Sequence, residues 1–220
     1  MYHYELLNNH YVVTIDGKRF LIDTGCRSSF NMTGIPSILT IDGKTYRLGA
    51  KPSNMDLPEA FETIGAEVDG FIGMDILRQT SLTLRKDGTL EFAALPLKGK
   101  EVPLIVGTAL TCPIQYEGKE CRIIIDTGAR YGYGGFDVFR GRKPFRYKVK
   151  DYNPDLKIMF SDLYHIPFVF AGKEVIVDMG LNQALFFQLR MYESIGFTNV
   201  TELFEDTLVF DFQKKKLIVK

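Results

Sequence analysis

The sequence predicts an all-β protein made of two similar halves. Three observations carry this prediction: short runs of alternating apolar residues recur along the chain, turn residues separate these runs, and one stretch of sequence is repeated. Segments with helical periodicity are few and short. Many short strands combined with a duplicated segment indicate two similar β lobes.

The repeat opens each half with a hairpin. Tyr11–Gly25 and Pro113–Gly128 each contain an apolar strand, an acidic residue followed by Gly and Lys, a second apolar strand and the tripeptide Asp-Thr-Gly. An acidic residue and a glycine between two strands predict a tight hairpin, because glycine adopts the positive φ that such turns need.

Each half continues with a second glycine that follows apolar residues. Gly73 lies within Val68–Leu77 and Gly180 lies within Val175–Leu181, and we expect the two to be equivalent. A stretch with helical character follows each glycine, and a strand or hairpin closes each half. The expected helical stretches are Met74–Arg78 and Leu181–Tyr192, and the closing hairpins are Ser81–Phe92 and Thr207–Val219.

The repeat also defines the domain organisation. We expect an N-terminal lobe over residues 1–96 and a C-terminal lobe over residues 108–220, each with one Asp-Thr-Gly loop. Residues 97–107 contain glycine and proline and are predicted to connect the lobes.

Composition and charge argue against several classes of function. Of the 220 residues, 45% are hydrophobic and 25% charged, which is typical of a globular protein. The 27 basic and 27 acidic residues give a net charge of zero, so neither nucleic acid nor a membrane is expected as a partner. Residues 1–10 lack the pattern of a signal segment and no apolar run reaches membrane-spanning length, so we expect a soluble, cytoplasmic protein. The three cysteines match no zinc pattern, so we expect reduced thiols and neither a metal nor a cofactor.

The most specific motif is the pair of Asp-Thr-Gly tripeptides, Asp23–Gly25 and Asp126–Gly128, each behind three apolar residues. The pair resembles the motif of the aspartic peptidases, and Phe71–Leu77 is similar to a segment of the retroviral-type members. The resemblance covers nearly the whole chain, which matches two fused retroviral-type subunits. It implies the bilobal aspartic-peptidase (acid protease) fold, with two β lobes related by a pseudo-twofold axis and the Asp loops meeting at that axis.

The chemistry of the resemblance needs two carboxyl groups. Asp23 and Asp126 would share one proton, so that one activates a water molecule and the other protonates the carbonyl oxygen of a peptide bond. The supporting residues would be Thr24 and Thr127, which bond across the axis, and Gly25 and Gly128, which allow close approach. The predicted function is therefore an aspartic endopeptidase, acting as a monomer on a peptide or protein substrate.

Two features depart from the family pattern. Cys26 and Ala129 follow the tripeptides where many members have Ser or Thr, so we expect ionisation of the dyad to be harder and activity to lie nearer neutral pH. The substrate-covering flap is weakly marked. Ile41–Tyr46 is the best hairpin signal, which makes Tyr46 the flap candidate in the first half. In the second half, Tyr131–Gly135 follows Asp126 too closely and Phe145–Asp162 is the other candidate.

Three alternatives remain at the level of sequence. The tripeptides could be ordinary β-turns, or Cys26 could pair with His10 or His165 as a nucleophile. The main rival is a catalytically silent aspartic-peptidase-like protein that binds an extended peptide in its groove by strand addition.

Overall fold

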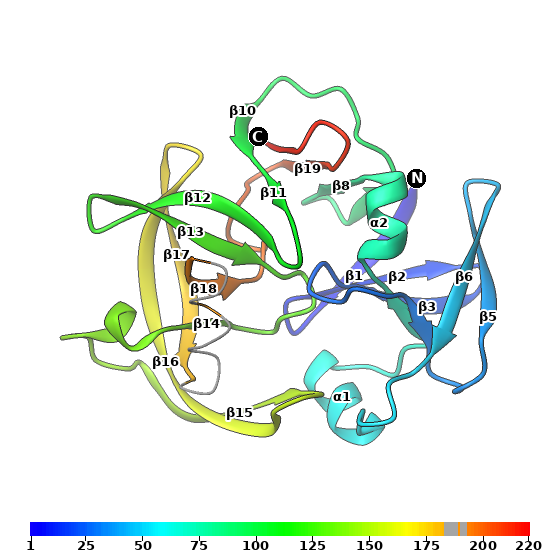
Figure 1. The fold of residues 1–220 in the computed structure, drawn as a ribbon, viewed down its shortest axis with the longest axis horizontal. Helices are drawn as coiled ribbons and strands as arrows, with labels where there is room; N and C mark the ends of the chain where they lie inside the picture. Colours follow the sequence, from blue (N-terminus) through cyan, green and yellow to red (C-terminus); the bar gives the residue numbers. More distant parts are fainter. Residues whose placement is uncertain (183–188, 190–192) are drawn as a thin grey trace.

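The computed structural model describes residues 1–182, 189 and 193–220, and it is all-β with two short α-helices (Figure 1). Most of the expected helical stretch Leu181–Tyr192 lies outside the described residues. The first half contains β1 (Tyr2–Leu7), β2 (His10–Ile15), β3 (Lys18–Ile22), β4 (Phe30–Asn31), β5 (Ser37–Ile41), β6 (Lys44–Ala50), α1 (Leu57–Ile64), β7 (Gly70–Ile72), α2 (Met74–Thr80), β8 (Leu82–Arg85) and β9 (Thr89–Glu91). The second half contains β10 (Lys100–Pro103), β11 (Ile105–Val106), β12 (Leu110–Tyr116), β13 (Lys119–Ile125), β14 (Gly132–Gly134), a 3-10 turn (Phe136–Phe139), β15 (Arg146–Asn153), β16 (Lys157–Phe170), β17 (Lys173–Leu181), β18 (Ser194–Thr198), β19 (Thr207–Asp211) and β20 (Lys216–Val219).

The two hairpins predicted from the repeat are present. Asp16 and Gly17 join β2 to β3, and Glu117 and Gly118 join β12 to β13. The acidic residue has φ 50° and the glycine φ 74° in both turns. Both central residues are therefore left-handed, as tight two-residue hairpins require.

The halves share one order of strand pairings beyond these hairpins. In the first half β3 runs parallel to β7, β7 pairs with β4, and β4 runs parallel to β6. In the second half β13, β18, β14 and β17 repeat this pattern. The equivalent of β7 is therefore β18, and the expected equivalence of Gly73 and Gly180 was wrong. Gly180 lies on β17 opposite Tyr133, as Gly49 lies on β6 opposite Phe30.

The strands form two sheets, of twelve and of eight strands. Six strands of the second half, in the order β12-β13-β18-β14-β17-β16, close into a barrel through the pairing of Gln115 with Val169. The twelve-stranded sheet includes β19 and β20, because β19 pairs antiparallel with β8 and β20 pairs with β10. The two closing hairpins of the halves thus lie in one sheet.

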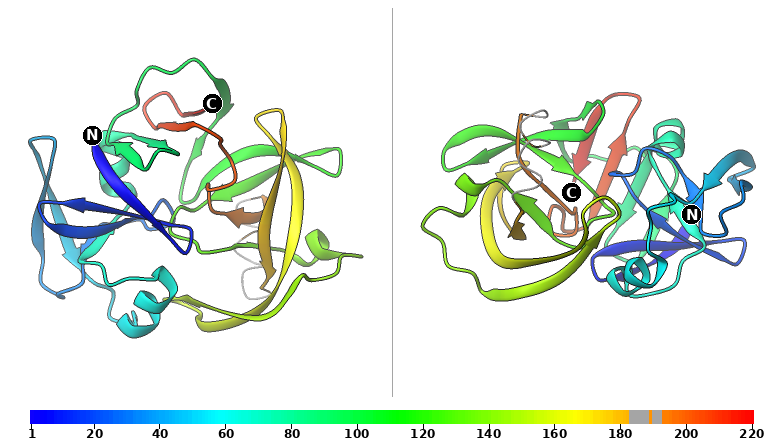
Figure 2. Two further views of the ribbon diagram at one scale, coloured as in Figure 1. Left: turned by 180° about the vertical axis from the view of Figure 1, so that it is seen from behind. Right: turned by 60° about the horizontal axis from the view of Figure 1, so that its bottom comes forward.

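The residues expected to connect the halves are themselves partly strand, since β10 and β11 lie within 97–107. One buried apolar cluster extends through both halves and includes Ile22, Leu84, Ile125 and Phe210. Both termini lie on one side of the molecule, opposite α1 and β15 (Figures 1 and 2). None of the described helices has the length and hydropathy needed to cross a bilayer.

Candidate active site

The two Asp-Thr-Gly loops begin at equivalent strand ends. Asp23 follows β3, and its backbone N–H donates to Ile72 O at 3.0 Å on the adjacent β7. Asp126 follows β13, and its backbone N–H donates to Thr198 O at 2.9 Å on the adjacent β18. Each aspartate is therefore held where a strand ends beside a parallel neighbour.

The structure brings Asp23 and Asp126 together. A Cβ atom placed on Gly25 would lie 2.5 Å from Cγ of Asp126, and one placed on Gly128 would lie 2.3 Å from Cγ of Asp23. Such distances are too short for real Cβ atoms, so each carboxyl group packs on the glycine backbone of the opposite loop. The two carboxyl groups are within hydrogen-bonding reach of each other.

Two threonines join the loops beneath the carboxyl groups. Thr24 N–H donates to Thr127 Oγ1 and Thr127 N–H donates to Thr24 Oγ1, both at 3.0 Å. The hydroxyl groups in turn donate across the interface, Thr24 to Ile125 O at 3.0 Å and Thr127 to Ile22 O at 2.8 Å. Both threonines are buried. Four hydrogen bonds thus fix the position of each loop relative to the other half.

The environment of the dyad favours a shared proton. Burial and the neighbouring carboxyl group raise the pKa of Asp23 well above its usual value, and burial raises the pKa of Asp126. Backbone donors act in the opposite direction: Asp23 Oδ1 accepts from Gly25 at 2.8 Å and Cys26 at 2.9 Å, and Asp126 Oδ1 accepts from Gly128 at 2.9 Å. Two carboxyl groups in contact resist double ionisation, so the pair can hold one proton while one oxygen remains a base.

The thiol of Cys26 is not activated. Its Sγ donates to Ser28 O at 3.2 Å, and burial together with the charge of Asp23 raises the pKa of the thiol. His10 is engaged elsewhere, with Nε2 at 3.1 Å from Gly128 O, and burial lowers its pKa to about 4. His165 lies 2.8 Å from Asp178. No hydrogen bond joins either histidine to Cys26 among the described residues, which disfavours a Cys–His nucleophile.

A serine and an aspartate that sequence reasoning did not connect support the first loop. Ser29 Oγ accepts from Gly73 N–H at 2.8 Å and donates to Asp75 Oδ1 at 2.6 Å. The carboxylate of Asp75 also accepts the N–H of Ser29 at 2.8 Å. This network ties the loop after Asp23 to the start of α2.

Asn199 plays the corresponding role in the second half, in the place of Gly73. Its Nδ2 donates to Ala129 O and to Asn9 O, both at 2.7 Å, and its Oδ1 accepts from Thr201 N–H at 2.9 Å. One side chain thereby connects the loop after Asp126 with the β1–β2 turn of the first half.

A sequence signal for this second support did exist. Gly70-Phe71 in β7 and Gly196-Phe197 in β18 are the same dipeptide at equivalent positions. Both glycines are needed for close approach, because a Cβ on Gly70 would lie 2.4 Å from Phe30 O and one on Gly196 would lie 2.5 Å from Tyr133 O. Ile72-Gly73 follow the dipeptide in the first half and Thr198-Asn199 follow it in the second, so the two segments do not look alike in the sequence.

The flap expectation for the first half was wrong. Tyr46 lies on β6 with only 8% of its surface exposed and packs in the main core. The tip of the β5–β6 hairpin is held by a hydrogen bond of 3.0 Å from Tyr2 Oη to Asp42, at the edge of the molecule and away from the central loops (Figure 1). Tyr46 therefore cannot cover the dyad.

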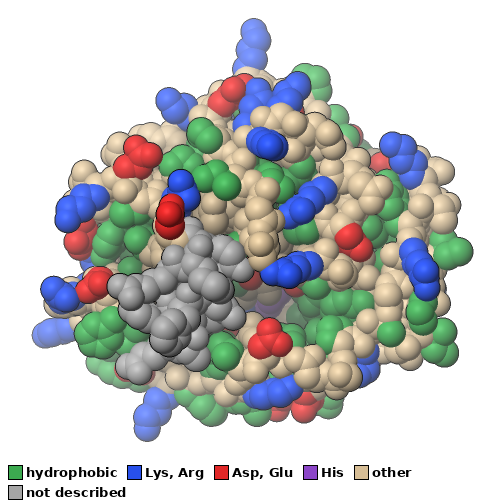
Figure 3. Space-filling model, in the orientation of Figure 1, with side chains coloured by type: hydrophobic (Ala, Val, Ile, Leu, Met, Phe, Trp, Pro, Cys, Tyr) green, Lys and Arg blue, Asp and Glu red, His purple; other side chains and the backbone are tan. Residues whose placement is uncertain are grey.

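The hairpin β15–β16, which contains most of the other candidate Phe145–Asp162, spans the two halves. Its far end contacts α1 of the first half (Figure 1). The space-filling view shows the molecule hollowed in this region (Figure 3). The hydrogen bonds that join the hairpin to the first half are Asp56 N–H to Tyr152 Oη at 2.7 Å, Asn54 Nδ2 to Pro154 O at 3.2 Å and to Asp155 Oδ1 at 3.1 Å, and Lys157 Nζ to Asn54 O. Lys150 adds ion pairs with Glu59 at 2.7 Å and Glu62 at 2.9 Å.

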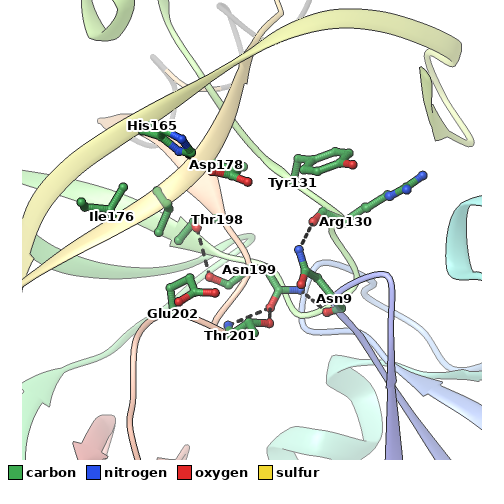
Figure 4. A pocket seen from close by; sticks show the side chains of 12 residues that line it. Asn9, Arg130, Tyr131, His165, Ile176, Asp178, Thr198, Asn199, Thr201 and Glu202 are labelled. Carbon is green, nitrogen blue, oxygen red and sulfur yellow. Dashed lines mark hydrogen bonds and ion pairs between the residues drawn. The ribbon is translucent and has the colours of Figure 1, made fainter. Parts of the chain in front are cut away.

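A cavity of about 220 Å³ adjoins the second loop (Figure 4). Arg130, Tyr131 and Asn199 line it on the side of the loop, and Asp178 and Glu202 line it farther away. Arg130 is joined to the β1–β2 turn, because its carbonyl oxygen accepts from Asn9 Nδ2 at 2.9 Å. Of all the expected site residues, only Tyr46 lies away from the centre.

No protein-family model matches the sequence, and no curated protein is significantly similar to it. Within the described residues, no group of three or more His, Cys, Asp or Glu side chains is placed to hold a metal ion. The geometry of the two aspartates and of the loops that hold them is therefore the main indication of function.

Proposed function

We propose that this chain is an aspartic endopeptidase with the bilobal acid-protease fold, in which one chain supplies both carboxyl groups. The observation that carries the proposal is the pair of carboxyl groups, each packed on the glycine of the opposite loop and held by the four threonine hydrogen bonds. An ordinary β-turn needs no partner loop, so the turn interpretation does not account for this arrangement.

The dyad supports hydrolysis without a covalent intermediate. The ionised carboxyl group takes a proton from a water molecule, whose oxygen forms a bond with the carbonyl carbon of the peptide. The protonated carboxyl group gives its proton to the carbonyl oxygen. When the resulting diol collapses, the carboxyl group that took the water proton gives it to the amine nitrogen, the C–N bond breaks, and the other carboxyl group takes back a proton from a diol hydroxyl, which restores the singly protonated dyad.

In this proposal an extended peptide binds between the Asp loops and the β15–β16 hairpin, where the molecular surface is hollowed (Figure 3). The hairpin belongs to the second half and is joined to α1 of the first half through Tyr152 and Lys150. Backbone groups of a hairpin can pair with an extended peptide, which fixes the scissile bond over the carboxyl groups. Only the second half supplies such a hairpin among the described residues.

The proposal is tested by cleavage of a quenched-fluorescent peptide library. Asp23→Asn and Asp126→Asn should each abolish cleavage, while the matched control Asp137→Asn, an exposed residue paired with Arg140, should retain it. A statine-type inhibitor should bind the unmodified protein and lose affinity in Asp23→Asn, because its hydroxyl occupies the position of the water. Peptide binding without cleavage by the unmodified protein would instead support the silent peptide-binding protein.

A further inference from the structure

An arginine follows each Asp-Thr-Gly tripeptide at the same position. The loops read Asp23-Thr-Gly-Cys-Arg27 and Asp126-Thr-Gly-Ala-Arg130, so the two arginines are related by the internal repeat. Both lie on loops that flank the dyad, one from each half.

The backbone of each arginine is fixed while its side chain is left without an ion pair. Arg27 O accepts from Asp75 N–H at 3.1 Å, and Arg130 O accepts from Asn9 Nδ2 at 2.9 Å. Among the described residues neither guanidinium group forms an ion pair or hydrogen bond, a property shared by the exposed Arg47 and Arg146, which do not adjoin an Asp-Thr-Gly loop, whereas Arg19, Arg85, Arg122, Arg140 and Arg142 all form ion pairs. Guanidinium groups beside a groove that lack a carboxylate partner are suited to bind one from a ligand.

Arg130 lies between its loop and the β15–β16 hairpin. Its guanidinium lies 5.1 Å from the Tyr131 ring centroid and points toward the first half, away from Asp178 and Glu202 (Figure 4). Burial raises the pKa of Asp151 on β15, and the charge of Arg130 acts against this effect. The carboxylate of Asp151 already accepts hydrogen bonds from Tyr133 Oη at 2.7 Å and from Tyr152 N–H at 2.9 Å.

The arginines do not serve the dyad itself. Burial and the charge of Asp126 raise the pKa of Asp23, and the N–H groups of Cys26 and Gly25 act in the opposite direction. Neither guanidinium hydrogen-bonds an aspartate of the dyad. The two guanidinium groups can therefore attract negatively charged groups of a ligand bound on either side of the dyad.

We infer that Arg27 and Arg130 select peptides with acidic side chains on both sides of the scissile bond. This deepens the proposed function and rests on the same groove. A planar guanidinium group donates two parallel hydrogen bonds to the two oxygens of a carboxylate. Basic and amide side chains of a peptide lack this pair of charged acceptor oxygens. Arg130, which is half-buried and packed on Tyr131, selects more strongly than the exposed Arg27.

The first test is the cleavage profile of a peptide library with the unmodified protein, Arg27→Glu and Arg130→Glu. The unmodified protein should enrich Asp and Glu on both sides of the cut. Each substitution should reverse the preference toward Lys and Arg on one side only, with a change in the Glu-to-Lys ratio of kcat/KM of roughly tenfold for Arg130 and threefold for Arg27. Arg47→Glu, at an exposed arginine on β6, is the matched control and should leave the profile unchanged. Cleavage with no acidic preference, or a preference that neither substitution moves, would overturn the inference while leaving the peptidase intact.

A second test separates the inference from the peptidase proposal. Fluorescence anisotropy would measure binding of matched Glu, Gln and Lys peptides to Asp23→Asn, with and without Arg130→Glu. Tighter binding of the Glu peptide, reversed by Arg130→Glu and weakened by salt, would support the arginine sites even if the protein cleaves nothing. Equal binding of the three peptides would refute them.

Discussion

Replacing Thr24 by valine should destabilise the whole protein through the loop interface. Valine keeps the shape of threonine but removes the hydroxyl group, so Ile125 O loses a donor and Thr127 N–H loses its acceptor. Each lost hydrogen bond costs about 1 kcal/mol, and leaving a buried partner unsatisfied raises this to about 1–2 kcal/mol each. We therefore expect a loss of about 2–4 kcal/mol in the free energy of unfolding, or roughly 4–16 °C in Tm for a chain of this size.

The measurement is urea unfolding at neutral pH, and it does not depend on any assumed activity. Thr24→Ser retains the hydroxyl group and should recover most of the lost stability. The control is Thr40→Val, an exposed threonine on β5, which should change stability by less than about 0.5 kcal/mol. A change for Thr24→Val as small as that of the control would show that the cross-interface hydrogen bonds do not hold the two halves together.

Three other perturbations have expected outcomes. Asp23→Asn should raise Tm at neutral pH. The pKa of Asp23 is raised in the folded state, so its carboxyl group favours folding while it is protonated at low pH, and this stabilisation is lost as the pH rises through the folded pKa. The difference in Tm between the variant and the unmodified protein should therefore vanish in acid. Gly128→Ala should abolish cleavage and lower Tm, because the added methyl group would overlap the Asp23 carboxyl group and force the loops apart. Lys150→Gln removes both ion pairs to α1 and should speed amide hydrogen exchange in β15, with little change in the exchange of β13; equal exchange in the two proteins would show that other contacts hold the hairpin.

The sequence predicted those parts of the fold that local chemistry determines. The turns at Gly17 and Gly118 and the strand ends at the two aspartates follow from residue types over a few positions, so they could be recognised without knowledge of distant contacts. The tripeptide repeat also predicted that Asp23 and Asp126 would meet.

The parts that were missed depend on contacts between distant segments. The strand beside Asp126 ends at Thr198, and the next residue, Asn199, replaces the glycine of the first half with a side-chain network, so no glycine pattern marks it. The sequence offered Phe145–Asp162 as one of two candidates for a hairpin in the second half, and the contacts with α1 that distinguish it are visible only in the structure. That helix did carry local signals, an Asp56 cap that accepts from Glu59 N–H at 3.3 Å and a left-handed Gly65 at φ 89°, which the sequence analysis did not use.

The sheet that contains both closing hairpins has a consequence for how the site depends on protein concentration. A dyad that takes one carboxyl group from each of two separate chains exists only above the dissociation constant of their dimer. Here β8 and β19 belong to one chain and pair directly, so the encounter of the two Asp loops is intramolecular. Dilution should therefore leave the dyad assembled, and the melting temperature should be the same at nanomolar and micromolar protein. Because the halves need not be identical, the second half carries the long β15–β16 hairpin although the first half, residues 1–96, has no matching hairpin.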